Sequence, residues 1–309
     1  MSKTVIFMGT PQIAAPSFQA LLDAGFNVPL AVSQPDKPKG RGNILQPTPI
    51  KEAALARNIP VFQPDKLRNN LAAIETLRSY KPDFIAVVAY GKILPKEILE
   101  IPTFAPINLH FSLLPLYRGA APVNWAIING DAKTGVSTMK MDEGMDTGDI
   151  LLSKEIDIND RNAAELADEL AQIGSELLVK SVREFESIIP QKQNDSLATT
   201  APMLKKEDGL IDWRKSAAEI ERMIRAFVLW PTSYTYLKGK TLKVTASEVD
   251  EEYAGNNPGT IYFVGKKYFC VGAGKHGLII KEVQLEGKRS MTSAEFLAGY
   301  KLEEGLSLG

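Results

Sequence analysis

The feature that most constrains the fold is the alternation of strand and helix signals through the first half of the chain. The segment Asp83–Val88 (Asp-Phe-Ile-Ala-Val-Val) reads as an apolar strand, which is typical of a parallel strand buried on both faces. Strands are expected at Thr4–Met8, Val28–Val32, Val61–Phe62, Asp83–Val88, Ile107–His110 and Gly135–Met141, and helices at Ser17–Ala24, Pro49–Arg57, Asn69–Ser79 and 163–187. This order predicts an α/β fold with an open, doubly wound, mostly parallel sheet.

The pattern changes after Ile189-Pro190. Residues 190–208 are expected to form a linker, because the polar stretch 191–200 shows neither helical nor strand periodicity. Ser216 and Glu219 then form a capping-box pattern at the start of a helix. The strands expected after it are Ser233–Leu237, Leu242–Ala246, Gly259–Val264, Tyr268–Val271 and Leu278–Gln284, followed by a short helix at Thr292–Gly299. Short strands with Gly-rich turns predict a small antiparallel β-barrel, and hence domains at 1–189 and 209–309.

Charge and length narrow the class of protein. The chain has 309 residues, enough for two domains, and its 36 Lys+Arg against 37 Asp+Glu give a net charge of −1. This balance disfavours a protein that coats nucleic acid by bulk charge, but it does not exclude a local basic patch. The lysine-rich strands of the second half fit either a solvated surface or an RNA-facing one. No stretch of about 18 apolar residues occurs, so we expect a cytoplasmic protein without a membrane partner.

Histidine and cysteine counts exclude several chemistries. There are two histidines, His110 and His276, and one cysteine, Cys270, so neither a multi-histidine zinc site nor a disulfide framework can form. We expect no metal site. His276 lies in Gly-Lys-His-Gly and reads as a hairpin-turn residue, while Cys270 lies in an alternating strand and reads as a packing residue. Acid–base chemistry by histidine therefore points to His110.

Asn108 and His110 are the first candidate pair. They lie two residues apart on an expected strand, so both side chains point to the same face. The carboxyl end of a parallel strand is where open α/β sheets place their ligands. An amide donor beside a histidine suits a polarised carbonyl group. A purely structural hydrogen-bonded pair at a strand end is the alternative.

A Gly-punctuated acidic loop follows downstream, at Met141–Asp149 (Met-Asp-Glu-Gly-Met-Asp-Thr-Gly-Asp). One of its carboxylates could reach the neighbouring strand end and hold an imidazolium. A plain turn is the alternative, and the spacing does not fit an EF-hand. Gly9-Thr10-Pro11 is no dinucleotide fingerprint, a P-loop is absent, and Ser112 lacks a GxSxG context.

The residues as a whole resemble the N10-formyltetrahydrofolate-dependent formyltransferase family. The likeness is carried by NLHFSLLPLYRGAAPVNWAIINGD and MDEGMDTGDIL. Three further segments are similar to the members that act on methionyl-tRNA: VIFMGTPQIAAPSFQALL, SQPDKPKGRGNILQPTPIK and KKEDGLIDW. The resemblance covers residues 4 to 301 and implies a Rossmann-like catalytic domain followed by an OB-like, tRNA-binding barrel.

The resemblance implies a role for individual residues. Asn108, His110 and Asp146 fall on the family's catalytic positions. The residues implied to bind folate are Ser112, Leu113, Leu114, Pro115, Ala89, Tyr90, Gly91, Ile93 and Asp142. Those implied to grip the tRNA acceptor end are Lys37, Lys39 and Arg41, with the barrel lysines facing RNA. Phe111 stands where the family more often has a small residue, and we expect it to change packing only.

The implied activity is transfer of the formyl group of 10-formyltetrahydrofolate, a co-substrate and not a bound cofactor, to the α-amino group of methionine on initiator methionyl-tRNA. We expect a monomer. One alternative is a related folate-dependent enzyme that formylates a sugar-nucleotide amine or hydrolyses the formyl donor. Another is a non-catalytic RNA-binding protein that uses the barrel, against which the intact Asn108, His110 and Asp146 argue.

Overall fold

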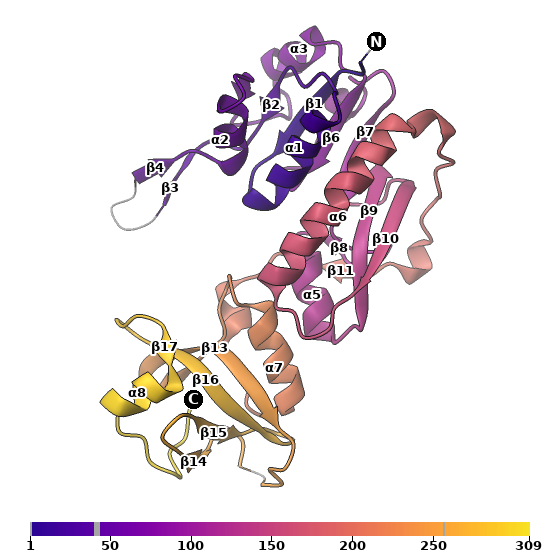
Figure 1. Cartoon of the computed structure of the whole chain (residues 1–309). Helices are drawn as coiled ribbons and strands as arrows, with labels where there is room; N and C mark the ends of the chain where they lie inside the picture. The colour runs from indigo at the N-terminus through magenta and orange to yellow at the C-terminus, as the bar shows by residue number, and fades with distance from the viewer. Residues whose placement is uncertain (1, 40–43, 256) are drawn as a thin grey trace. The chain divides into compact units, whose positions relative to one another are not determined.

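The computed structural model describes residues 2–39, 44–255 and 257–309 (Figure 1). The chain forms two compact units that do not follow a single cut in the sequence. The N-terminal unit comprises Met1–Pro122, Lys133–Asp157 and Ala167–Pro202, and the C-terminal unit comprises Val123–Ala132, Ile158–Leu166 and Met203–Gly309. Each unit has its own sheet. No helix in the described ranges is long and apolar enough to cross a membrane.

The N-terminal unit is built on a seven-stranded sheet in the order β10-β9-β7-β6-β1-β2-β5. Its strands are β1 (Val5–Gly9), β2 (Ala31–Val32), β5 (Val61–Phe62), β6 (Phe84–Val88), β7 (Ala105–His110), β9 (Lys133–Lys140) and β10 (Ile150–Asp157). Five neighbouring strands, β5, β2, β1, β6 and β7, run parallel to one another. The strands β9 and β10 are added beside β7 in antiparallel pairing. The predicted open, mostly parallel sheet is confirmed.

Helices cover both faces of this sheet (Figure 1). They are α1 (Ala15–Asp23), α2 (Pro49–Leu55), α3 (Leu71–Ser79), α4 (Lys96–Leu99) and α6 (Ala163–Arg183). One face of β1 and β6 packs against Leu77 of α3 and Ile98 of α4 in a buried cluster. On the other face, the ring of Phe7 lies 5.2 Å from that of Phe18 in α1. A Cβ on Gly174 of α6 would come within 2.8 Å of Leu109, so the helix approaches β7 closely. The fold is therefore doubly wound.

Several elements differ from expectation. The strand expected at Val28–Val32 shrinks to two residues, because Pro29 has no amide hydrogen to donate to a ladder. The short hairpin of β3 (Lys37–Lys39) and β4 (Ile44–Gln46) and the edge strand β10 were not anticipated.

The segment expected as a linker is largely ordered into the N-terminal unit. Gln191 pairs with Ile150 through both backbone groups, and β11 (Thr200–Ala201) lies parallel to β8 (Arg118–Gly119). The structure thus places Ala167–Pro202, and with it most of the expected linker, in the first unit. The functional domain boundaries at 189 and 209 remain a prediction.

The C-terminal unit contains an antiparallel half-barrel of six strands, in the order β12-β13-β16-β15-β14 with β17 on β16. They are β12 (Tyr234–Leu237), β13 (Lys240–Asp250), β14 (Ile261–Val264), β15 (Phe269–Gly272), β16 (Gly277–Leu285) and β17 (Met291–Thr292). The helices of the unit are α5 (Pro122–Asn129), α7 (Ala217–Ala226) and α8 (Ser293–Gly299). The five expected strands, the Ser216–Glu219 capping box and the turn at His276 are confirmed.

Residues of α5 belong to this unit because polar groups tie them to α7. The Asn124 side chain donates to the carbonyl of Ala226 (2.7 Å), and Arg222 donates to the carbonyl of Ile128 (3.2 Å). Both bonds satisfy carbonyls near helix ends, which have no partner within their own helix.

Candidate active site

The carboxyl ends of three adjacent parallel strands define the candidate site. Gly9 pairs with Val88, and Val88 with Leu109, so β1, β6 and β7 end at the same level. The strand order reverses between β1 and β6, which is the position where open α/β sheets bind ligands. Thr10 links the loop after β1 to those after β6 and β2, because its hydroxyl donates to the carbonyl of Tyr90 (3.0 Å) and accepts from the amide of Gln34 (3.3 Å).

The three residues expected to be catalytic lie together at this edge. Asn108 and His110 share a face of β7, and Asp146 reaches them from the loop between β9 and β10. Asn108 Nδ2 lies 3.4 Å from Asp146 Oδ1, and His110 Nδ1 lies 3.7 Å from Asp146 Oδ2. His110 is only 6% exposed, and Asn108 and Asp146 are half-buried. The amide, the imidazole and the carboxylate therefore form one polar cluster.

The orientation of His110 is set by a backbone carbonyl. Its Nε2 lies 2.8 Å from the oxygen of Tyr117, and because a carbonyl can only accept, Nε2 carries the hydrogen. Nδ1 is then the nitrogen that faces Asp146. Protonation of the ring places a second N–H on this side, where the Asp146 carboxylate is near enough for an ion pair but too far for a hydrogen bond.

Asp146 is held by groups that are distant in the sequence. The amide of Gly119 donates to Oδ2 (2.8 Å), and Gln193 Nε2 donates to the backbone carbonyls of Asp146 (2.8 Å) and Gly148 (2.7 Å). Asp146 has a φ of +56°, a conformation that a non-glycine residue keeps only when its surroundings impose it. Arg118 in turn donates to Oε1 of Gln193 from Nε (3.1 Å) and Nη2 (2.8 Å).

Gln193 was missed at the sequence level. It lies in the stretch that was expected to be a linker, yet it is only 6% exposed. Nothing in its polar, aperiodic neighbourhood separates a buried glutamine from a solvated one. Gly119 lies within a quoted motif, but its amide role was also missed. A Cβ there would come within 2.6 Å of the carbonyl oxygen of Ala201, and its φ is +126°, so glycine is required.

Replacing Gln193 tests this support. We expect Gln193→Ala to lower the free energy of unfolding by about 1–3 kcal/mol, because the part-buried carbonyl of Asp146 and the buried carbonyl of Gly148 lose their donor. Denaturant unfolding measures it. Gln191→Ala is the matched control, since that side chain is exposed, and its change should stay within about 0.5 kcal/mol. Equal stability of the two variants would show that the amide of Gln193 does not hold the Asp146 loop.

In the expected folate-binding segment after β7, polar groups form hydrogen bonds to other groups of the protein. The hydroxyl of Ser112 is buried and donates to the carbonyl of Leu116 (2.6 Å). The amide of Leu114 donates to Ser137 Oγ (3.1 Å). Leu113 and Pro115 are half-buried, whereas Leu114 is buried. The neighbouring Phe111 is buried as well, as a packing residue should be. Ligand contacts of Ser112–Pro115 remain a prediction.

The other expected folate-binding segment follows β6, and its conformation makes the backbone more accessible to a ligand than most of its side chains. Ala89 and Gly91 both have left-handed backbone, with φ of +46° and +86°. The ring of Tyr90 is 2% exposed and packs in the core, where burial raises its pKa to about 12. Ile93 is exposed. This arrangement suits a pocket lined by backbone, and the contacts of these residues to folate remain a prediction.

Asp142 is exposed and holds its own loop, because its Oδ1 accepts from the amide of Gly144 (3.0 Å) and the hydroxyl of Thr147 (2.7 Å). Its expected role toward folate remains a prediction. Over the described ranges, no group of three or more His, Cys, Asp and Glu side chains is arranged to hold a metal ion.

Two of the residues expected to contact tRNA, Lys37 and Lys39, lie in β3. Lys37 is exposed, Lys39 ends β3, and Arg41 lies outside the described residues. The base of the hairpin is anchored by Asp36, which pairs with Lys51 (2.5 Å) and accepts from Gln63 (2.7 Å). These two hydrogen bonds, first that of Gln63 and then that of Lys51, lower the pKa of Asp36.

Comparison with known proteins adds independent information. The family model for formyl transferase matches residues 2–182, and that for the formyl transferase C-terminal domain matches residues 203–301. A protein of Geobacter sulfurreducens named methionyl-tRNA formyltransferase is 46% identical over 99% of this chain and 96% of its own length. One of Clostridium novyi with the same name is 48% identical over 97% of each chain.

A solved structure shares the fold. The N-formyltransferase of Helicobacter canadensis, in complex with folinic acid and dTDP-3-aminofucose, superimposes with a TM-score of 0.66 at 22% identity, covering 91% of this chain and 99% of its own. At that identity the likeness extends to the architecture alone.

Proposed function

Because this chain belongs to the formyl transferase family, we propose that it transfers the formyl group of 10-formyltetrahydrofolate to the α-amino group of methionine on initiator methionyl-tRNA. The observation that carries this choice of acceptor is the likeness to proteins named methionyl-tRNA formyltransferase, which extends over both units and nearly the full length of each chain. The polar cluster of Asn108, His110 and Asp146 supplies the groups that such a transfer requires.

The cluster supports the following sequence of steps. The amine nitrogen attacks the formyl carbon, a C–N bond forms, and the formyl oxygen gains negative charge. Asn108 Nδ2 and the Nδ1–H of protonated His110 are the proposed donors to that oxygen. Collapse of the tetrahedral intermediate breaks the bond between the formyl carbon and N10.

Asp146 is the proposed proton carrier. The attacking amine must lose a proton and the departing N10 must gain one, so the net proton count is unchanged. A carboxylate at this position can accept the first and pass it on, while it pairs with the imidazolium. The amide of Gly119 keeps the carboxylate in place without supplying a charge.

The rival acceptor is a sugar-nucleotide amine. The H. canadensis enzyme named above is crystallised with such a sugar, but it is 22% identical, against 46–48% for the relatives named for methionyl-tRNA. The deciding experiment supplies purified protein with labelled 10-formyltetrahydrofolate and one of three acceptors: methionyl-tRNA, free methionine or a dTDP-amino sugar. We expect label only on methionyl-tRNA. Label on the sugar, or release of free formate without acceptor, would overturn the proposal.

The hairpin offers a test of the tRNA contact. We expect Lys37→Glu to raise the KM for methionyl-tRNA several-fold and to leave the KM for 10-formyltetrahydrofolate unchanged. One lost phosphate contact should also lower the log–log salt slope of tRNA binding by about one. Lys81→Glu is the control, because Lys81 is exposed and precedes β6, at the amino-terminal ends of the parallel strands. The hairpin instead follows the carboxyl end of β2. If both variants change tRNA use equally, Lys37 makes no specific contact.

A further inference from the structure

One face of the C-terminal half-barrel carries aromatic and hydrogen-bonding side chains in register across three strands. Tyr234 of β12 lies opposite Lys243 of β13, which lies opposite Gln284 of β16, and Tyr236 lies opposite Thr241. The alternate residues of these strands are buried on the other face: Thr235, Leu237, Leu242, Val244 and Leu285. The aromatic row therefore belongs to the outer face, where packing against the core of the unit does not explain it.

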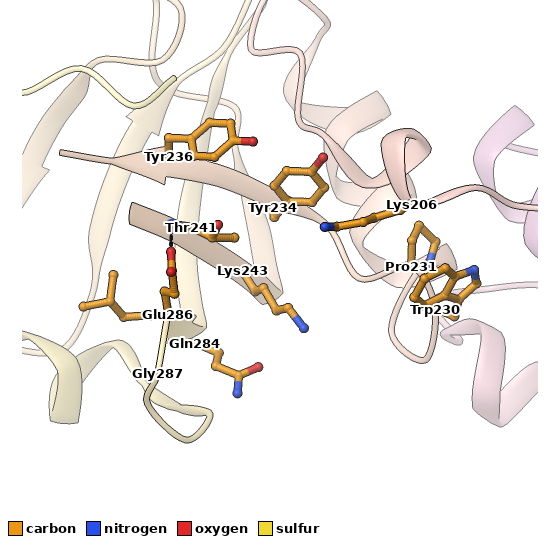
Figure 2. Close-up of a pocket in the computed structure, with 11 residues that line it drawn as sticks. Lys206, Trp230, Pro231, Tyr234, Tyr236, Thr241, Lys243, Gln284, Glu286 and Gly287 are labelled. Carbon is orange, nitrogen blue, oxygen red and sulfur yellow. Dashed lines mark hydrogen bonds between the residues drawn. The ribbon is translucent and has the colours of Figure 1, made fainter. Parts of the chain in front are cut away.

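These side chains line a hollow of about 430 Å³, here called the aromatic pocket, whose further lining residues include Lys206, Trp230 and Glu286 (Figure 2). The volume lies within the range of roughly 300–1,000 Å³ that is typical of small-ligand sites. All of its residues come from the C-terminal unit. It shares none with the cluster around His110.

The rings in the pocket are open to a flat partner. Those of Tyr234 and Tyr236 lie 6.0 Å apart at 87°, edge to face, so at least one ring keeps both faces uncovered by the other. Tyr236 is 37% exposed and Trp230 is 54% exposed. Exposed aromatic rings on a sheet are the usual platform on which unpaired nucleobases stack.

The charges of the pocket favour a phosphate. Neither Lys206 nor Lys243 forms an ion pair within the described part of the chain, so both ammonium groups are available. The single carboxylate, Glu286, already accepts a hydrogen bond from the amide of Thr241 (3.0 Å). Two free cations beside open rings match a nucleotide, which offers a flat base and an anionic phosphate.

We propose that the aromatic pocket binds one unpaired nucleotide of the RNA substrate, with its base stacked on Tyr236 and its phosphate beside Lys243 and Lys206. The identity of the RNA rests on the function proposed above. A duplex segment does not fit this chemistry, because the faces of paired bases are covered by their neighbours.

The test titrates the full chain with a fluorescein-labelled single-stranded RNA hexamer of adenylate, measured by anisotropy. We expect Tyr236→Ala to weaken binding about tenfold, as the loss of one stacked base does, and Tyr236→Phe to bind as the unchanged protein does. Phe263→Ala is the matched control, because Phe263 is an exposed aromatic residue of β14 outside the pocket. Denaturant unfolding establishes that each variant is folded.

The outcomes separate this proposal from the proposed function. Unchanged hexamer affinity of Tyr236→Ala would overturn the pocket even if formyl transfer to methionyl-tRNA is observed. Equal loss in Phe263→Ala, or equally tight binding of an RNA duplex, would overturn it as well. An absence of formyl transfer by the unchanged protein would refute the function and leave the hexamer titration to decide the pocket. With both correct, Tyr236→Ala raises the KM for methionyl-tRNA and not that for 10-formyltetrahydrofolate.

Discussion

Asp146→Asn is expected to lower kcat for formyl transfer by about 10²–10⁴-fold, the usual contribution of a positioned acid–base group. The substitution keeps the shape of the side chain and an oxygen that can accept from the amide of Gly119. It removes the charge that faces His110 Nδ1 and the capacity to carry a proton. Single-turnover measurement with saturating 10-formyltetrahydrofolate isolates the chemical step.

Glu143→Gln is the matched control for Asp146→Asn, because it neutralises a carboxylate of the same loop that is exposed and faces Lys96 at 3.7 Å. Its kcat should remain near that of the unchanged protein. The Asn variant should also unfold at a similar denaturant concentration, since the backbone bonds from Gln193 are retained. Near-normal turnover of Asp146→Asn would remove Asp146 from the proposed mechanism.

The strands and helices were predictable from the sequence where their hydrophobic periodicity is strong. The buried strands β1, β6 and β7 and the helix α6 were predicted because their apolar spacing dictates one packing. The edge strand β10 was not, because its burial is intermittent and its residues include Ser153, Lys154 and Glu155. The pairing of β8 with β11 was also hidden, since it joins two residues to two others far along the chain.

The sequence predicted the catalytic side chains of the candidate site, but not the groups that hold them in place. A spacing of two residues places Asn108 and His110 on one face of any strand, and the acidic loop was visible as a motif. The carbonyl of Tyr117 and the amide of Gly119 are backbone groups, which every residue type carries, so no residue pattern reveals them. Gln193 acts through a contact that only the folded chain creates.

His110→Gln is expected to reduce kcat by about 10²–10³-fold, the usual cost of losing one donor to an oxyanion. The glutamine amide can still donate to the carbonyl of Tyr117, which Nε2 of the histidine does at 2.8 Å. It has no second nitrogen to face Asp146 and cannot become an imidazolium. The activity loss should therefore appear in a protein that remains stable, as measured by single-turnover formyl transfer and by denaturant unfolding.

His110→Ala separates the two tasks of the ring. It removes the donor to the buried carbonyl of Tyr117 as well as the nitrogen that faces Asp146, so it should lose activity to a similar extent and also about 1–3 kcal/mol of unfolding free energy. Nε2 would then account for the difference in stability between the two variants, and Nδ1 for the activity that both lack. If His110→Gln instead retains turnover, a neutral amide suffices at this position, and the charged imidazole has no part in formyl transfer.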